Sequence, residues 1–180
     1  VPIEQWRDES LRGIILTGGP NSVYAEGAPR MKEEILHLGV PVLGICYGMQ
    51  LINDLCGGRV ESAEVREYGH TMLCVTDSAL FKGVQPETAV FMNHGDRVSV
   101  LPKGFTADAS TANCPIAAFS DAARGLYGVQ FHPEVRHSVE GTTMLRNFVF
   151  GVCGCRGGYR AEDTIERMIA EIRRQVGSGK

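Results

Sequence analysis

Val40-Pro41-Val42-Leu43-Gly44-Ile45-Cys46-Tyr47-Gly48-Met49-Gln50 is the stretch that decides the fold of this chain. It predicts a buried apolar strand over 40–45, a sharp turn, and a helix over 47–56 that ends at two glycines. Residues 44–48 have the form Gly-x-nucleophile-x-Gly, with sulfur where hydrolases of this shape carry a serine. The flanking glycines have a steric reason, because a nucleophile on so tight a turn leaves little room for neighbouring side chains.

Cys46 is the candidate nucleophile at this turn. Its place at a helix N-terminus favours negative charge on the sulfur, and the turn directs the thiol toward the carboxyl ends of the strands. The alternative is a small buried hydrophobic residue, which is what most free cysteines are. The turn alone does not decide between the two.

The composition excludes several classes of protein. The chain has 180 residues, enough for one domain with a substantial core, and a net charge of −3 without an evident basic patch, so we expect no nucleic-acid partner. No apolar run approaches the ~18 residues that span a bilayer, so we expect no membrane association. The six cysteines form no Cys-x-x-Cys pair, which favours reduced thiols in the cytoplasm and no metal site. Cys153-Gly154-Cys155 is interpreted as structural, with redox or metal binding as the alternative.

The rest of the chain alternates strands and helices before and after a strand-rich middle. Apolar periodicity and turn residues predict helices over 30–38, 139–150 and 161–176, with a short helix before Leu11. The last helix is amphipathic, so we expect it to dock on a partner. The predicted strands are 13–17, 59–65, 71–76, 88–92, 98–101, 105–110, 116–120 and 126–131.

The second half of a thiol site follows the last strand as His132-Pro133-Glu134. In extended chain, residues two apart point the same way, so His132 could face Cys46 as a base while Glu134 orients its imidazole. A lone His-x-Glu is usually incidental. Its place after an apolar strand, in a chain with a cysteine turn, favours a Cys-His-Glu triad.

Three weaker candidates accompany the triad. Gly18-Gly19-Pro20 breaks the first strand and could cradle a phosphate or equally offer backbone N–H groups to an oxyanion, although by itself a plain turn is the favoured interpretation. Gln50 lies one helical turn after Cys46 and could bind a small polar substrate or lie on the surface. Asn93-His94-Gly95-Asp96 is predicted as a turn between two strands.

Three of these motifs, in this order and spacing, resemble the signatures of class I (triad-type) glutamine amidotransferase domains. They are Gly18-Gly19-Pro20, Gly44 to Gln50, and Gln130-Phe131-His132-Pro133-Glu134. Further stretches are similar to the branch of this family formed by the glutaminase domains of GMP synthetases. These stretches are residues 18–24, 66–70, 93–96, 147–150 and 151–155.

The resemblance implies an α/β fold of three layers, with a mostly parallel, flavodoxin-like central sheet flanked by helices and added antiparallel strands. It implies that glutamine is hydrolysed to glutamate and ammonia through a triad. The site residues that it implies are Cys46, His132 and Glu134 as the triad; Gly18, Gly19 and Tyr47 as the oxyanion hole; and Gln50, Asn93, His94, Gly95 and Asp96 as glutamine-binding residues.

The resemblance also implies a division of the chain. Residues 1–150 correspond to the glutaminase domain without its first strand-helix unit, and residues 151–180 to a linker and helix leading toward an ATP pyrophosphatase domain. That synthetase domain would accept the ammonia and use ATP and Mg²⁺ to convert XMP to GMP. No cofactor is expected in this chain, whose sequence lacks the nucleotide-binding Ser-Gly-Gly-x-Asp-Ser loop.

Three questions stay open at this point. The acceptor of the ammonia could instead belong to anthranilate, carbamoyl phosphate or CTP synthesis. The domain could also be a silent regulatory module on the same fold. The full-length enzyme could also be a homodimer.

Overall fold

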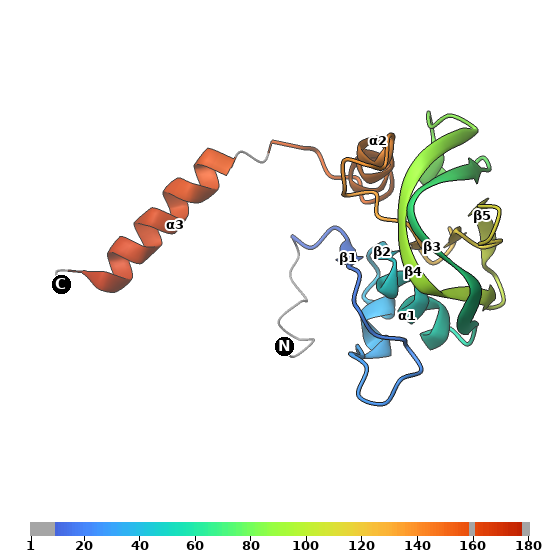
Figure 1. The fold of residues 1–180 in the computed structure, drawn as a ribbon. Coiled ribbons are helices and arrows are strands. Elements are labelled where there is room, and N and C mark those ends of the chain that lie inside the picture. Colours follow the sequence, from blue (N-terminus) through green and yellow to red (C-terminus); the bar gives the residue numbers. More distant parts are fainter. Residues whose placement is uncertain (1–9, 159–160, 178–180) are drawn as a thin grey trace.

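The computed structural model describes residues 10–158 and 161–177, so the short helix predicted before Leu11 falls almost entirely outside the described residues. Seven strands form one sheet, with helical segments packed on both faces and the last helix apart from it (Figure 1). The elements in chain order are β1 (Ile14–Leu16), η2 (Glu33–His37), β2 (Val42–Ile45), α1 (Tyr47–Leu55), β3 (Arg59–Val75), η3 (Ala79–Phe81), β4 (Glu87–Val100), β5 (Thr106–Ser110), β6 (Ala118–Asp121), β7 (Leu126–Val129), α2 (Gly141–Arg146), η4 (Asn147–Val152) and α3 (Ala161–Val176).

The sheet has a parallel part and an antiparallel part, in the order β1-β2-β7-β6-β5-β3-β4. β1, β2 and β7 are parallel, and the remaining neighbours pair antiparallel. β2 and β7 are fully buried, as expected for parallel strands covered on both faces. The predicted α/β class is confirmed, with the parallel strands β1, β2 and β7 at one end of the sheet and the antiparallel strands added beyond them.

Two apolar cores lie on the two faces of the sheet, because successive residues of a strand point to opposite sides. On one face, Leu43 and Val129 pack with Phe148 of η4. On the other, Val42 and Leu126 pack with Ile52 of α1. Helix α1 is therefore held against the sheet by its apolar side, and its N-terminus lies at the carboxyl end of β2.

The middle of the chain differs from the prediction in two places. The strands predicted over 59–65 and 71–76 are one strand, β3, and those over 88–92 and 98–101 are one strand, β4. The turn predicted over 93–96 is therefore wrong: these residues lie inside β4, paired with β3. Cross-strand pairing overrides the local preference of turn-forming residues, as tertiary context often does.

Helical segments match the prediction to different degrees. The helix predicted over 30–38 is only the short 3-10 helix η2, and the helix predicted over 139–150 is α2 continued by the π-helix η4. Helix α3 has the predicted bounds. Figure 1 shows α3 apart from the sheet. Its exposed apolar residues are Ile165, Met168, Ile169, Ile172 and Val176. Among the described residues, no helix is long and apolar enough to cross a membrane.

Candidate active site

Cys46 lies between the end of β2 and the start of α1, in a backbone conformation that L-residues seldom adopt. Its φ is 52°, and it is the one non-glycine residue with a positive φ in the described part of the chain. Hydrogen bonds hold the turn on both sides: the Cys46 N–H donates to Val129 at 2.8 Å, and its carbonyl accepts from the Gln50 N–H at 3.2 Å. Strained conformations of this kind persist where the surrounding structure fixes them, which is typical of nucleophile turns.

The two glycines of the turn are required by close approach of backbone atoms. A Cβ on Gly48 would lie 2.3 Å from the carbonyl oxygen of Leu16 in β1. A Cβ on Gly44 would lie 2.5 Å from the carbonyl of Gly48. The crowding predicted from the Gly-x-Cys-x-Gly pattern is thus present, and it packs the start of α1 directly on β1.

His132 follows β7 and reaches the sulfur from the neighbouring strand. A hydrogen bond to Cys46, and then the Glu134 carboxylate 2.7 Å from Nδ1, raise the His132 pKa to about 9 against the opposing effect of burial. The backbone of His132 is also held, since its N–H donates to Phe91 and its carbonyl accepts from the Ser138 hydroxyl. The imidazole is therefore protonated near neutral pH and lies between the sulfur and a carboxylate.

The segment that carries His132 and Glu134 is not the extended chain that the sequence predicts. Residues 133 and 134 lie in a turn after Gln130. The turn still brings the two side chains together, because Glu134 contacts Nδ1 and leaves Nε2 for the sulfur. The three side chains of the predicted triad are gathered at one place.

Gly18 and Gly19 lie beside the Cys46 turn. A Cβ on Gly18 would lie 3.1 Å from the His132 ring and 3.6 Å from Cβ of Cys46, so this glycine lies next to both. A Cβ on Gly19 would lie 3.4 Å from the Tyr47 ring. The Tyr47 N–H is at the N-terminus of α1, where backbone N–H groups lack helical partners and favour negative charge.

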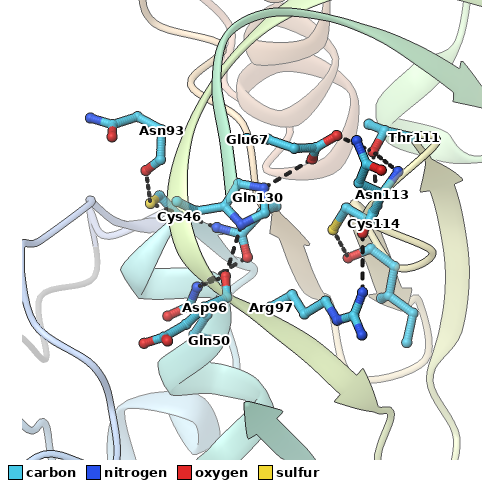
Figure 2. Close-up of polar contacts among 12 residues, drawn as sticks. Cys46, Gln50, Glu67, Asn93, Asp96, Arg97, Thr111, Asn113, Cys114 and Gln130 are labelled. Atoms are coloured by element: carbon cyan, nitrogen blue, oxygen red, sulfur yellow. Dashed lines mark hydrogen bonds and ion pairs between the residues drawn. The ribbon is translucent and has the colours of Figure 1, made fainter. Parts of the chain in front are cut away.

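A cavity of about 450 Å³ opens beside Cys46. Gln50 and the predicted residues 93–96 contribute to its wall, together with Gly19, Pro20, Asn21, Ser22, Tyr47 and Arg66. The Asn93 carbonyl oxygen lies 3.7 Å from the Cys46 sulfur and accepts from the thiol (Figure 2). The Asp96 side chain accepts from the Tyr24 hydroxyl at 2.7 Å. Such a cavity suits a small polar molecule.

Two residues of the site were not identified as site residues from the sequence. Gln130 is fully buried, and its Nε2 lies 3.7 Å from the Cys46 sulfur. Arg66 lines the cavity and extends across Gly95, whose missing Cβ would lie 3.4 Å from the Arg66 Nε. Both stand in stretches that carry the family resemblance, and that was their one signal in the sequence.

Glu67, His94 and Cys114 form a buried group whose potential ligand atoms lie within 4.8 Å of one another. Hydrogen bonds already occupy them: His94 Nε2 contacts Glu67 at 3.0 Å, and the Cys114 thiol donates to Ile116. Burial, and then the Glu67 charge, raise the pKa of Cys114 to about 12, which keeps the sulfur protonated. A metal ion would have to displace these hydrogen bonds and the thiol proton, so the residues fit a hydrogen-bonded group better than a metal site.

Comparison with known proteins agrees with this fold. Residues 1–152 match the family described as glutamine amidotransferase class-I, and the chain belongs to that family. It is 50% identical over 181 residues to the proteins named GMP synthase [glutamine-hydrolyzing] of Bacillus cereus and of Heliobacterium modesticaldum. Each alignment covers 100% of this chain but 35% of the relative, so the chain spans about a third of their length.

Solved structures place the fold in the same group. A protein from Thermoplasma acidophilum, provisionally named as one component of a GMP synthase, is 35% identical with a TM-score of 0.68, over 81% of this chain and 74% of its own. A glutamine amidotransferase from Thermotoga maritima has a TM-score of 0.61 at 22% identity, over 84% of this chain and 65% of its own. The second similarity concerns the fold alone.

Proposed function

We propose that this chain hydrolyses the side-chain amide of glutamine to glutamate and ammonia, with Cys46 as nucleophile, His132 as acid and base, and Glu134 as the group that orients His132. One observation carries the proposal: the cysteine on a strained helix N-terminus contacts a histidine whose other ring nitrogen lies 2.7 Å from a carboxylate. Nucleophile, base and orienting group are the three roles of a triad.

In the first step, the Cys46 thiolate attacks the amide carbon. The oxyanion that forms accepts hydrogen bonds from the backbone N–H of Tyr47 and from Gly18 or Gly19, and each such donor is typically worth about 2.7–4 kcal/mol. The proton on His132 passes to the amide nitrogen as the carbon–nitrogen bond breaks. Ammonia leaves, and the glutamyl group remains on the sulfur as a thioester.

In the second step, His132 is neutral and takes a proton from water as the water attacks the thioester. Collapse of the second tetrahedral intermediate frees the thiolate and glutamate, and His132 is again protonated. A positioned histidine typically contributes ~10²–10⁴-fold to such proton transfers. Glu134 keeps the tautomer and orientation of the ring through both steps.

The cavity is complementary to the free amino acid at its other end. Arg66 and Asp96 both line it, so one cation and one anion are available for the α-carboxylate and the α-ammonium of glutamine. A fork-shaped guanidinium suits a carboxylate, since two parallel N–H···O bonds can form. Among the predicted binding residues, Asp96 therefore binds through charge, whereas Asn93, His94 and Gly95 act mainly through their backbone and Gln50 through its amide.

The acceptor of the ammonia belongs to the same proposal. The relatives of 50% identity are named GMP synthases, and about two thirds of their length lies outside the alignment. We therefore assign the ammonia to a synthetase domain that uses ATP and Mg²⁺ to convert XMP to GMP. Residues 1–150 form the glutaminase domain, residues 151–180 lead toward the synthetase domain, and the reaction takes place in the cytoplasm.

Labelling and turnover test the proposal together. A glutamine analogue that alkylates the nucleophile should give a single adduct on Cys46 by mass spectrometry, and excess glutamine should protect it. Cys46→Ala should abolish glutamate release while the unfolding transition stays within about 1 kcal/mol of wild type, because the substitution only removes the sulfur. Turnover is measured with the synthetase domain of a relative present. Glutamate release by Cys46→Ala near the wild-type rate would refute the assignment.

A further inference from the structure

A continuous series of polar contacts runs from a buried acid to the reactive sulfur (Figure 2). It begins at Glu67 and His94, which contact each other at 3.0 Å. It passes through the backbone carbonyl of Asp96 to Gln50, and from Gln50 to Gln130. Gln130 ends the series with its Nε2 at 3.7 Å from the Cys46 sulfur.

The direction of each hydrogen bond in this series follows from one fixed group. A backbone carbonyl can only accept, so the Asp96 oxygen must receive N–H donors from His94 Nδ1 at 2.9 Å and from Gln50 Nε2 at 3.0 Å. The Gln50 amide is thereby oriented, and its second N–H faces Oε1 of Gln130 at 3.1 Å. Because Oε1 of Gln130 faces this donor, the NH₂ group of Gln130 must face the sulfur.

We propose that Gln130 is a catalytic residue that donates an N–H to the Cys46 thiolate, and that Asp96 and Gln50 hold its amide in the donating orientation. The inference rests on the proposed role of Cys46 as nucleophile and adds a second group that stabilises its charged form. Gln130 has 0% exposure, so water cannot replace this donor. Hydrogen bonds to an ionised partner are the strong ones, particularly in a buried site.

Glu67 and His94 anchor the far end of the series. His94 Nδ1 carries a proton for the Asp96 carbonyl, and one further proton is shared between His94 Nε2 and Glu67. The second carboxylate oxygen of Glu67 accepts from the Thr111 hydroxyl at 2.7 Å. Because the pair is buried and satisfied, it fixes the Asp96 carbonyl, and these two are positioning residues.

The test must separate the effect of Gln130 on Cys46 from the effects of the other charged groups near the sulfur. His132, which is paired with Glu134, contacts Cys46, and Arg66, His94 and Asp96 line the cavity beside Cys46. All of these residues are retained in the Gln130 variants. A change in the pH dependence of Cys46 in that variant therefore reports the lost donor.

The test is alkylation of the full chain by iodoacetamide across a pH series, with each cysteine followed by peptide mass spectrometry. Exposed Cys74 is the internal reference for reagent and pH. Gln130→Met keeps the side-chain volume but removes the donor. In this variant the alkylation rate of Cys46 relative to Cys74 should fall about tenfold near neutral pH, because the pH midpoint of Cys46 alkylation moves up by about one unit. Gln130→Glu, which puts carboxylate oxygen against the sulfur, should lower it further.

Two more variants make the outcome decisive. Gln50→Met leaves Gln130 in place but frees its amide to rotate, so a smaller shift in the same direction is expected. Asn53→Leu removes another buried amide of α1, which bonds to the Arg59 carbonyl, and should leave the Cys46 profile unchanged. A folded Gln130→Met variant with the wild-type profile overturns the proposal; if that variant does not fold, an unshifted Gln50→Met profile overturns it.

The readout does not require glutamine. If glutamine hydrolysis is absent but Gln130→Met shifts the Cys46 profile, the donor role stands and the proposed function fails. If hydrolysis is present but the profile is unshifted, the proposed function stands and the donor role fails. The two proposals can therefore be refuted separately.

Discussion

Replacing Gly48 by alanine tests the idea that Cys46, the proposed nucleophile, is held in place by backbone contact between α1 and β1. The added methyl would lie 2.3 Å from the Leu16 carbonyl oxygen and 2.8 Å from the Leu16 carbonyl carbon and Cβ. Ordinary van der Waals contact begins near 3.4 Å, so a gap of about 1 Å must open. Backbone of a strand cannot turn aside as a flexible side chain can, and therefore the start of α1 must move.

Both stability and reactivity should respond to that movement. Overpacking of this kind costs about 1–3 kcal/mol, which for a chain of this size lowers the melting temperature by roughly 2–4 °C per kcal/mol. A displacement of about 1 Å at a reacting atom can cost on the order of 100-fold in rate. Cys46 is two residues from the substitution and shares the turn, so it should lose more reactivity than a distant cysteine.

The assay combines thermal unfolding with the rate of Cys46 alkylation relative to Cys74. Gly151→Ala is the matched control, because no heavy atom lies within 4 Å of the Cβ that it adds. We expect Gly151→Ala to behave as wild type and Gly48→Ala to lose both stability and Cys46 reactivity. A Gly48→Ala variant that melts with wild type and alkylates at the wild-type rate would show that the contact does not position the thiol.

Two further substitutions test the charges of the site. Glu134→Gln removes one cause of the raised His132 pKa, so NMR titration of the variant should show the ring losing its proton below about pH 9, and an unmoved titration would contradict the contact. A raised pKa in the folded state stabilises the fold below about pH 6.5, and this stabilisation is lost as the pH rises through about 9. The difference in unfolding free energy between wild type and variant should therefore disappear over this pH range. Arg66→Met should raise KM for glutamine about tenfold or more with little change in kcat, whereas KM for the analogue with an α-carboxamide in place of the α-carboxylate should not change. Arg59→Met replaces an exposed arginine on the same strand and is the control. An equal change in KM for both substrates would exclude a contact between Arg66 and the carboxylate.

Local signals in the sequence predict the Gly-x-Cys-x-Gly turn well. Gly44 and Gly48 have a steric role that the spacing alone indicates, and β2 and α1 begin and end within two residues of the predicted bounds. The pairing of Cys46 with His132 also follows from the sequence, because each lies after an apolar strand and parallel strands end at the same edge. Both inferences use short-range patterns and one rule of sheet topology.

The antiparallel part could not be predicted in the same way. Residues 93–96 and Gly69 favour turns locally, and Gly69 does have a φ of +99°, yet both lie inside long strands. What keeps them there is pairing between β3 and β4, which joins residues far apart along the chain. Gln130 is a similar case, since the role proposed for this amide at the end of an apolar strand depends on its contacts with Gln50 and Cys46.

One irregularity of that pairing supplies two parts of the site at once. The register of β3 and β4 shifts between Ser62 and Glu67, so residues 63–66 oppose Gly95 alone. Such a bulge redirects side chains, and successive residues after it point to opposite faces. Arg66 accordingly lines the cavity, while Glu67 turns inward to His94. The cation proposed to bind the substrate and the anchor proposed to orient the thiol's hydrogen-bond donor are therefore adjacent residues. A change in this register would disturb substrate affinity and thiol reactivity together, whereas single substitutions at the two positions should separate them.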